Sequence, residues 1–472
     1  MKKLRKFLLL SLLVLMFQGF SLFTSLPASA KSLVLIGGGL KPVLQSCNND
    51  PGKSDPSFVH TQAIYQKMIE LAGGSSKAKI GVITAASDSP SNDKYANDPC
   101  KASNYKDNGI YYVKAFKKLG AADAQVIPID LDHISNKNSP EVVKQVNSMT
   151  GFFFGGGDQS RLIESFLNKD NTDSTVLTAI RRNYDSGAAI FGTSAGTAVQ
   201  AGGSYVRNNT VKLPMITGGE SYEALLDKKL CKQNREALSN KNYCPNQDDL
   251  SYYPEGGFGF FKYGILDTHF AERGRQGRFV RLAWNNSIND AYAPDENTAL
   301  VVTDVDTPNV KMSVVGERGV NIFDLSNASP KSGACSRADI NYWRVCGVKY
   351  TYLTEADQYT PLTKTVYIAM WKSPLTGLEH YDKAKSPSQD ILSSPDNHKR
   401  ENPRELIEVA EDLFDSRSTS TYGETYEHNP IFRLTLAKEK SFESTGYYGI
   451  QDEEKFYSFK NLLLGFYVNQ SS

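Results

Sequence analysis

Short apolar runs alternate with helix-period segments in the first part of the chain, and this alternation most constrains the fold. The apolar runs are SLVLIGGG, KIGVITAASD, AQVIPIDL and GFFFGGG. Between them lie FVHTQAIYQKMIELAGG, NGIYYVKAFKKLG and a segment whose start, Ser139-Pro140, suits a capped helix. The runs are apolar on both faces, as in parallel strands covered by helices on each side. We therefore predict an α/β fold with a doubly wound, mostly parallel sheet.

The chain changes character beyond Thr303, where strand patterns such as KMSVVGERGVNIFDL, VYIAMW and IFRLTLAK surround one helical segment, ENPRELIEVAEDLFD. We expect a main α/β domain over residues 31–330 and a β-rich C-terminal extension, residues 331–472, that packs on it. A polar stretch at about 204–253 is predicted to be a surface insertion that borders the site. The polar segment 393–403 is predicted to be a loop or linker.

The first thirty residues have the pattern of a secretory signal peptide. Basic residues at positions 2, 3, 5 and 6 precede an apolar run from Phe7 to Phe17, and Ala28-Ser29-Ala30 forms an A-x-A cleavage site. The alternative is an uncleaved anchor, but the apolar run is shorter than the roughly 20 residues that span a bilayer. We expect cleavage near Ala30 and a secreted protein, extracellular or periplasmic, without stable membrane insertion.

Six cysteines fit an oxidising compartment, because none forms a C-x-x-C pair typical of zinc or redox sites. Spacing favours the bridges Cys231–Cys244 and Cys335–Cys346, which leaves Cys47 with Cys100. The chain carries 53 basic and 52 acidic residues, so no overall field attracts nucleic acid. The segment GGGDQS lacks the lysine and spacing of a phosphate-binding loop. We expect no metal, no cofactor and no nucleic-acid partner.

One serine stands where an apolar run meets a string of small residues, in AAIFGTSAGTAVQAGG. The residues Gly192-Thr193-Ser194-Ala195-Gly196 fit G-x-S-x-G between a short strand and a helix start, which is the pattern of a nucleophile elbow. Glycine on either side would let the strand and helix approach closely around a strained serine. The alternative is an ordinary turn in which Ser194 caps the helix.

A serine nucleophile needs a general base, and His269 is the histidine whose surroundings favour this role. It ends an apolar run in GILDTHFAERGRQGRFVRLA, although a histidine at a strand end can also simply bond to the backbone. The arginines that follow either form a solvated helix face or bind substrate carboxylates bidentately. These arginines are Arg273, Arg275, Arg278 and Arg281.

Four separated blocks, FFFGGGDQSRL, FGTSAGTAVQ, DTHFAERGRQGRFVRLA and DENTALVV, resemble the cyanophycinase family of serine peptidases, including its secreted members, and the related aspartyl dipeptidases. The resemblance extends over roughly residues 31–327. It implies a fold like that of class I glutamine amidotransferases, a homodimer and a Ser-His-Glu triad. By resemblance Ser194 is the nucleophile, His269 the base and Glu296 the orienting acid. Asp267 is the alternative acid, and Glu296 would then cap a turn.

The oxyanion of the reaction needs two backbone donors, for which we expect Ala195 together with Gly156 or Gly157. The resemblance further implies a substrate pocket in which carboxylates suit the arginines and a guanidinium suits Asp267. Its residues would be Gln159, Asp267, Thr268, Arg273, Arg275 and Arg278. At one position the chain departs from the family, because threonine at 268 stands where cyanophycinases usually have glutamine, and this could reshape the pocket.

The function predicted from these features is a secreted serine-type exopeptidase that acts through an acyl-enzyme. The resemblance implies cyanophycin as substrate, a poly-aspartate chain that carries arginine on its aspartate side chains, and β-aspartyl-arginine dipeptides as products. The alternatives are a related peptidase or isopeptidase for other aspartyl peptides, and a secreted binding protein with an inactive site.

Overall fold

A computed structural model describes residues 30–40, 57–98, 101–226, 230–240, 242–385 and 387–470. Its first sheet joins five parallel strands to an antiparallel part that begins with β13. In spatial order the strands are β18 (Thr365–Tyr367), β17 (Gln358–Thr360), β14 (Lys311–Gly316), β13 (Thr298–Thr303), β1 (Leu33–Ile36), β5 (Ala189–Thr193), β4 (Gly151–Phe154), β2 (Lys79–Ile83) and β3 (Asp123–Val126).

Helices cover both faces of this sheet, because successive residues of its strands point to opposite sides. In β1, Leu33 and Leu35 pack into the core under α4, α5 and α6, whereas Val34 and Ile36 pack into the core under α2 and α3. The prediction of a doubly wound α/β sheet is therefore confirmed. The helices are α2 (Ser57–Leu71), α3 (Tyr105–Lys118), α4 (Pro140–Val146), α5 (Gln159–Phe166) and α6 (Thr175–Asp185).

The predicted start of α4 is also confirmed. The Ser139 side chain accepts a hydrogen bond from the backbone N–H of Val142, and Pro140 occupies the first turn, where its missing N–H costs nothing. Asn104, Asp158 and Ser174 cap α3, α5 and α6 in the same way. Polar capping residues thus mark where α3, α4, α5 and α6 begin.

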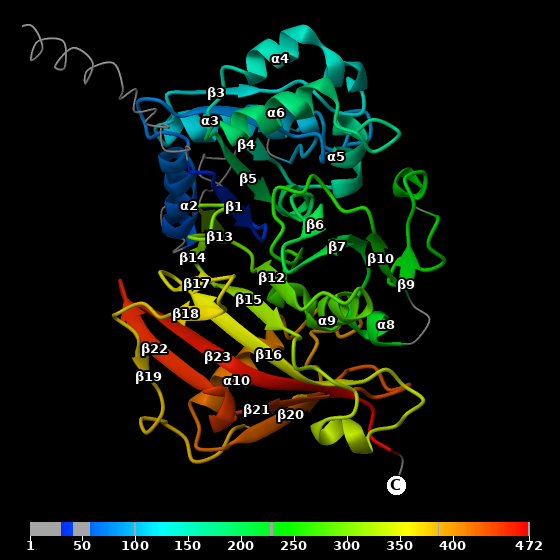
Figure 1. The fold of residues 1–472 in the computed structure, drawn as a ribbon, viewed down its shortest axis with the longest axis vertical. Helices are drawn as coiled ribbons and strands as arrows, with labels where there is room; N and C mark the ends of the chain where they lie inside the picture. The colour runs from blue at the N-terminus through cyan, green and yellow to red at the C-terminus, as the bar shows by residue number, and fades with distance from the viewer. Residues whose placement is uncertain are drawn as a thin grey trace, which may run out of the picture.

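A second, mostly antiparallel sheet lies beside the first, in the lower half of Figure 1. Its core packs against α8 (Ser221–Leu225), α9 (Gln276–Asn285) and α10 (Glu405–Phe414). Its main strands in order are β11 (Ile265–Leu266), β12 (Asp290–Pro294), β15 (Gly319–Asp324), β16 (Val345–Thr354), β23 (Glu454–Tyr467), β21 (Arg433–Ala437) and β20 (Ser420–Glu424). At one end β22 (Thr445–Gln451) pairs with β23 and β19 (Ser373–Pro374) pairs with β22.

The second sheet crosses the predicted domain boundary at residue 330. β15, from the predicted main domain, pairs over six residues with β16, from the predicted extension. The same extension contributes β17 and β18 to the first sheet. Residues 331–472 therefore complete both sheets, and the boundary at 330 stays a prediction.

The predicted strand VYIAMW is wrong in its second half. β18 ends at Tyr367, and the chain then turns, with the N–H of Ala369 donating to Asp357. Lys372, just after the turn, buries its ammonium against the Asp357 carboxylate at 2.8 Å. We attribute the early end of the strand to this buried ion pair, which the apolar pattern does not reveal.

The described residues within 204–253 form a separate group of small elements on one side of the molecule, drawn in green in Figure 1. A disulfide joins Cys231 to Cys244 within this group, as predicted. Besides α8, the elements are β6 (Ser204–Tyr205), β7 (Asn208–Lys212), β8 (Met215–Gly218), β9 (Leu230–Lys232) and β10 (Leu250–Tyr253).

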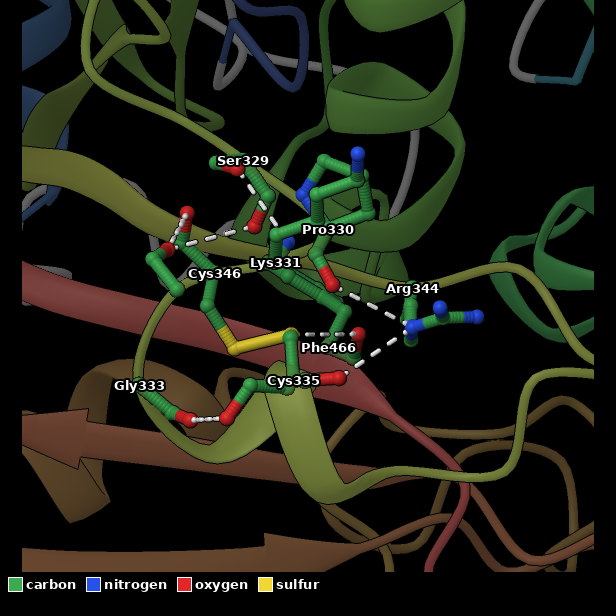
Figure 2. Close-up of a disulfide and its surroundings, with 10 residues drawn as sticks. Ser329, Pro330, Lys331, Gly333, Cys335, Arg344, Cys346 and Phe466 are labelled. Atoms are coloured by element: carbon green, nitrogen blue, oxygen red, sulfur yellow. Dashed lines mark hydrogen bonds between the residues drawn. A yellow bond between two sulfur atoms is a disulfide. The ribbon is translucent and has the colours of Figure 1, made fainter.

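The second predicted disulfide, Cys335–Cys346, ties a short 3₁₀ turn, η4 (Gly333–Arg337), to the start of β16 (Figure 2). Arg344 supports the turn by donating from Nε to the carbonyl oxygens of Pro330 and Cys335. Cys47, Cys100 and the predicted signal peptide, apart from Ala30, lie outside the described residues. Among the residues that are described, none belongs to a helix with the length and apolar character needed to cross a membrane.

Candidate active site

Ser194 lies in a strained turn between β5 and α7 (Ala195–Ala198). Its backbone has φ 53° and ψ −118°, which non-glycine residues rarely adopt. The side chain makes no capping hydrogen bond to α7. Ser194 therefore does not cap α7 with its side chain, and the capping alternative is not what the structure contains.

The glycines on both sides of Ser194 are required by close backbone contacts. A Cβ on Gly192 would lie 2.2 Å from the carbonyl oxygen of Gly196, and one on Gly196 would lie 2.0 Å from that of Phe154 in β4. Real Cβ atoms do not approach so closely. The two glycines of the G-x-S-x-G pattern are therefore required by the close packing of this turn.

Ser194, His269 and Glu296 form one chain of hydrogen bonds. The distance from Ser194 Oγ to His269 Nε2 is 2.7 Å, and that from His269 Nδ1 to Glu296 Oε1 is 2.6 Å. The His269 side chain is 12 % exposed and that of Glu296 33 % exposed. The three residues come from the β5–α7 turn, the loop after β11 and the β12–β13 loop, so their contact is purely tertiary.

Burial and the Glu296 carboxylate shift the pKa of His269 in opposite directions. Burial lowers the pKa of His269 below its ordinary value, and the hydrogen bond to Glu296 offsets part of this effect. The hydrogen bond from His269 in turn lowers the pKa of Glu296. At neutral pH the pair therefore consists of a neutral imidazole and a carboxylate, which suits a general base with an orienting acid.

The loop after β1 holds all three elements together, a role that sequence reasoning missed. The carbonyl oxygens of Ile36, Gly37 and Gly38 accept the N–H groups of Ser194, His269 and Asn297 respectively. Gly38 also lies close against the imidazole, because a Cβ there would be 2.2 Å from His269 Cε1. The signal is the GGG of SLVLIGGG, which a strand pattern alone does not distinguish from the end of a strand.

Asp267, the alternative acid, binds arginines instead of the histidine. Arg278 forms a bidentate pair with it, at 2.8 Å from Nε and 2.7 Å from Nη2, and Arg275 donates at 3.1 Å. Burial by itself would raise the pKa of Asp267, but the charges of Arg278 and Arg275 hold it below its ordinary value. The carboxylate side chain is 3 % exposed, so binding of a substrate guanidinium by Asp267 would require these arginines to move.

The other predicted pocket residues differ in how open they are. Arg273 is exposed, and its charge acts on both His269 and Glu296. Thr268 is buried, and its carbonyl oxygen accepts a bond from Arg275. Gln159, at the start of α5, donates to the carbonyl oxygen of Ile216 in β8 of the insertion. Of the predicted carboxylate-binding arginines, Arg273 is therefore the exposed one near His269 and Glu296.

Two cavities lie at the predicted oxyanion glycines, and one of these glycines borders Ser194. A Cβ on Gly156 would be 3.7 Å from Ser194 Oγ, so the backbone of this residue borders the hydroxyl. A cavity of about 730 Å³ is lined by Gly156, Gly157 and Asp158, and a second of about 420 Å³ by Gly157, Gln159 and residues of the insertion. The Ala195 N–H begins α7 directly after the serine. Within the described ranges no three His, Cys, Asp or Glu residues are grouped as metal ligands.

Comparison with known proteins identifies the family. The model of peptidase family S51 matches residues 60–309, more than half of the chain. The chain belongs to peptidase family S51. Members of S51 are serine-type hydrolases, so this chain is one too. The matched region ends within the segment before β14 and leaves most of the second sheet outside the S51 model.

Curated relatives and solved structures that align with the chain share low sequence identity with it. The chain is 27 % identical to a cyanophycinase of Geminocystis herdmanii over 56 % of this chain and 76 % of that protein, and 25 % identical to one of a Nostoc species over 65 % and 78 %. A peptidase from an acI-B1 actinobacterium aligns at 18 % identity and a TM-score of 0.39, over 62 % of this chain and 91 % of that one. A putative peptidase E of Listeria monocytogenes aligns at 10 % and 0.32, over 61 % and 99 %.

Proposed function

We propose that this S51 peptidase hydrolyses cyanophycin to β-aspartyl-arginine dipeptides through Ser194, His269 and Glu296. The observation that carries the proposal is the unbroken hydrogen-bond chain from Ser194 Oγ through His269 to Glu296. The cyanophycinases among its relatives support the choice of substrate. A strained serine, a neutral imidazole and a partly buried carboxylate in this order are the parts that acyl transfer requires.

The chemistry divides into acylation and deacylation. Ser194 Oγ attacks the carbonyl carbon of the scissile amide while His269 Nε2 takes the hydroxyl proton. The C–N bond then breaks, and His269 gives that proton to the leaving amine. Water, deprotonated by the same nitrogen, hydrolyses the ester and frees Ser194. Glu296 keeps Nδ1 protonated and stabilises the positive charge that the imidazole gains in each half.

The oxyanion of each tetrahedral intermediate would be bound by backbone N–H groups. Ala195 supplies one candidate donor, and Gly156, whose backbone borders the hydroxyl, supports the second position better than Gly157 does. Each such donor contributes about 3 kcal/mol to transition-state stabilisation. Both donors are main-chain groups, one two residues beyond the end of β4 and the other at the first residue of α7, so neither depends on a side-chain rotamer.

The substrate fits the charges and space around the serine. A terminal β-aspartyl-arginine unit carries carboxylates, for which the exposed Arg273 is the best-placed cation. The cavities of about 730 and 420 Å³ meet at Gly157 and leave room for a polymer on both sides of it. Arg275 and Arg278 are proposed to shape this pocket through Asp267, because their donors are already directed to that carboxylate.

The proposal is tested by incubating purified protein, from about Lys31 onward, with insoluble cyanophycin and analysing the soluble products by mass spectrometry. Release of β-aspartyl-arginine by the wild type, and none by Ser194→Ala, is the expected result. Hydrolysis of small aspartyl dipeptides with intact granules would assign the chain to another peptidase specificity. Failure of an active-site-directed serine reagent to label Ser194 would contradict the triad itself.

We also propose that the protein is exported and forms a homodimer. The two disulfides support an oxidising location, since such bonds persist outside the cytoplasm. N-terminal sequencing of the secreted or periplasmic fraction should find a start near Lys31. Sedimentation of the purified protein should give twice the chain mass, and a monomer at micromolar concentration would refute the dimer.

A further inference from the structure

The loops that carry His269 and Glu296 are tied to each other by two buried carboxylates. Asp295 accepts the N–H of Ala271 at 3.0 Å, so the Glu296 loop holds the His269 loop. In return Glu272 accepts the N–H of Glu296 at 3.1 Å. The reciprocal bonds fix the main chain on which the proposed base and acid stand. Their strength depends on both carboxylates remaining ionised acceptors.

The Asp295 and Glu272 carboxylates repel each other, because the charge of Glu272 acts on Asp295. Asp295 has no exposed side-chain surface and Glu272 only 10 %. Burial raises the pKa of Asp295, and the negative charge of Glu272 raises it further. A buried pair of like charges needs a cation, because otherwise one member takes up a proton and loses part of its capacity to accept hydrogen bonds.

Residues 331–472 supply a cation that both carboxylates share. Arg404 Nη1 donates to Asp295 Oδ2 at 2.9 Å and to Glu272 Oε1 at 3.1 Å. Its Nη2 donates to the hydroxyl of Tyr352, which itself donates to Asp295 at 2.9 Å. The Arg404 N–H also donates to the carbonyl oxygen of Ala271. Arg318 donates to Glu272 as well, but Arg404 is the arginine that bridges the two.

The second sheet fixes where this guanidinium stands. Arg404 is in the left-handed region, with φ 69°, directly before α10, whose Leu406, Ile407 and Ala410 are buried in the core of the second sheet. A second contact lies nearby, because Arg400 donates to the carbonyl oxygen of Arg273 at 2.8 Å. Residues 393–404 therefore pack against the His269 loop and do not act as a free linker.

We propose that Arg404, which lies beyond the region matched by the S51 model, is a positioning residue for the His269–Glu296 pair. Its bonds to Glu272 and Asp295 hold both carboxylates where they accept the N–H groups of the two loops, and so hold Glu296 against His269 Nδ1. The proposal rests on the proposed triad. It gives the C-terminal extension a part in the reaction without contact to substrate.

The test compares Arg404→Gln with Arg433→Gln, since Arg433 in β21 also binds a carboxylate, donating from Nε and Nη2 to Glu424 Oε1, away from the two loops. The readout is the rate at which a fluorophosphonate labels Ser194, measured from pH 4 to 9 on folded protein and independent of substrate identity. We expect Arg404→Gln to slow labelling about 10- to 100-fold. The acidic limb of its pH profile should move to lower pH. A displaced Glu296 no longer makes the hydrogen bond that raises the pKa of His269.

Arg404→Lys covers the case in which Arg404→Gln does not fold. Lysine keeps the charge but lacks the planar fork, so labelling should be intermediate. The positioning role is wrong if both variants are labelled at the rate of Arg433→Gln and keep the acidic limb of the wild-type pH profile. It is also wrong if their labelling falls only in proportion to the fraction of unfolded protein. In both cases the triad stands. If the wild type is not labelled at Ser194, the proposed function fails and this inference fails with it.

Discussion

Replacing Glu296 by glutamine should separate the triad acid from the alternative, Asp267. In the transition state His269 carries a positive charge that the Glu296 carboxylate stabilises across a 2.6 Å hydrogen bond. Two unit charges about 4 Å apart interact by about 4 kcal/mol at an effective dielectric constant of about 20. Because the Glu296 side chain is 33 % exposed, we reduce this to about 2–3 kcal/mol. Glu296→Gln should therefore lower kcat by about 30- to 150-fold.

The melting temperature of Glu296→Gln should change little, because the amide fills the same space and the carboxylate is partly solvated. Asp267→Asn should behave in the opposite way. It leaves the bidentate partner of Arg278 uncharged inside the protein, and breaking such a buried pair costs about 3–5 kcal/mol of stability. We expect its melting temperature to fall by about 5 °C or more, with a smaller loss of kcat in the fraction that remains folded.

The assay measures product release at saturating substrate, at least 15 °C below the melting temperature of the less stable variant, together with calorimetric melting. Circular dichroism gives the folded fraction by which each kcat is divided. A larger loss of kcat in Asp267→Asn than in Glu296→Gln, with an unchanged melting temperature, would refute the assignment of Glu296. The same result would also contradict the purely supporting role given to Asp267.

Four further outcomes follow from the site. Ser194→Ala should lower turnover by at least about 10³-fold with a melting temperature within a few degrees of wild type, as measured by product release and calorimetry. Because burial lowers the pKa of His269, the acidic limb of kcat/KM should fall below about pH 6.5, and a limb above that value would contradict a neutral base. Gly196→Ala should abolish soluble expression, since its Cβ would lie 2.0 Å from a β4 carbonyl oxygen, whereas Gly155→Ala, with its nearest atom at 3.5 Å, should express normally. Arg273→Lys should lower kcat/KM about tenfold with unchanged melting, and a silent substitution would make Arg273 part of a solvated face.

The parallel sheet could be predicted from the sequence because its signals are local. Leu33 to Ile36 show a buried strand by their own composition, and Ser139 with Pro140 shows a helix start. The pairs Cys231–Cys244 and Cys335–Cys346 were predictable because each is close in sequence. The early end of β18 was not predictable, since it depends on a lysine buried against Asp357.

The candidate site, too, was predictable only in part. Ser194 was identified from its G-x-S-x-G pattern, and His269 and Glu296 from a resemblance spread over several blocks. The pairing of Asp267 with Arg278, by contrast, involves two residues that sequence reasoning had assigned to substrate. Arg404 gave no signal at all, because the carboxylates that it binds lie more than a hundred positions away and its segment is as polar as an ordinary loop.

The loop after β1 shows why such a site can be held without a recognisable side-chain motif. Three successive carbonyl oxygens, from Ile36 to Gly38, accept the N–H groups of Ser194, His269 and Asn297. Every residue has a carbonyl oxygen, so these bonds do not require particular residue types at the three positions. The exception is Gly38, where the ring of His269 excludes a Cβ. The geometry of the serine, histidine and glutamate is therefore set by main chain on one side and by the carboxylates that Arg404 bridges on the other. The side chains of the proposed triad can then be replaced with little loss of stability, because their placement comes from bonds that they do not themselves make.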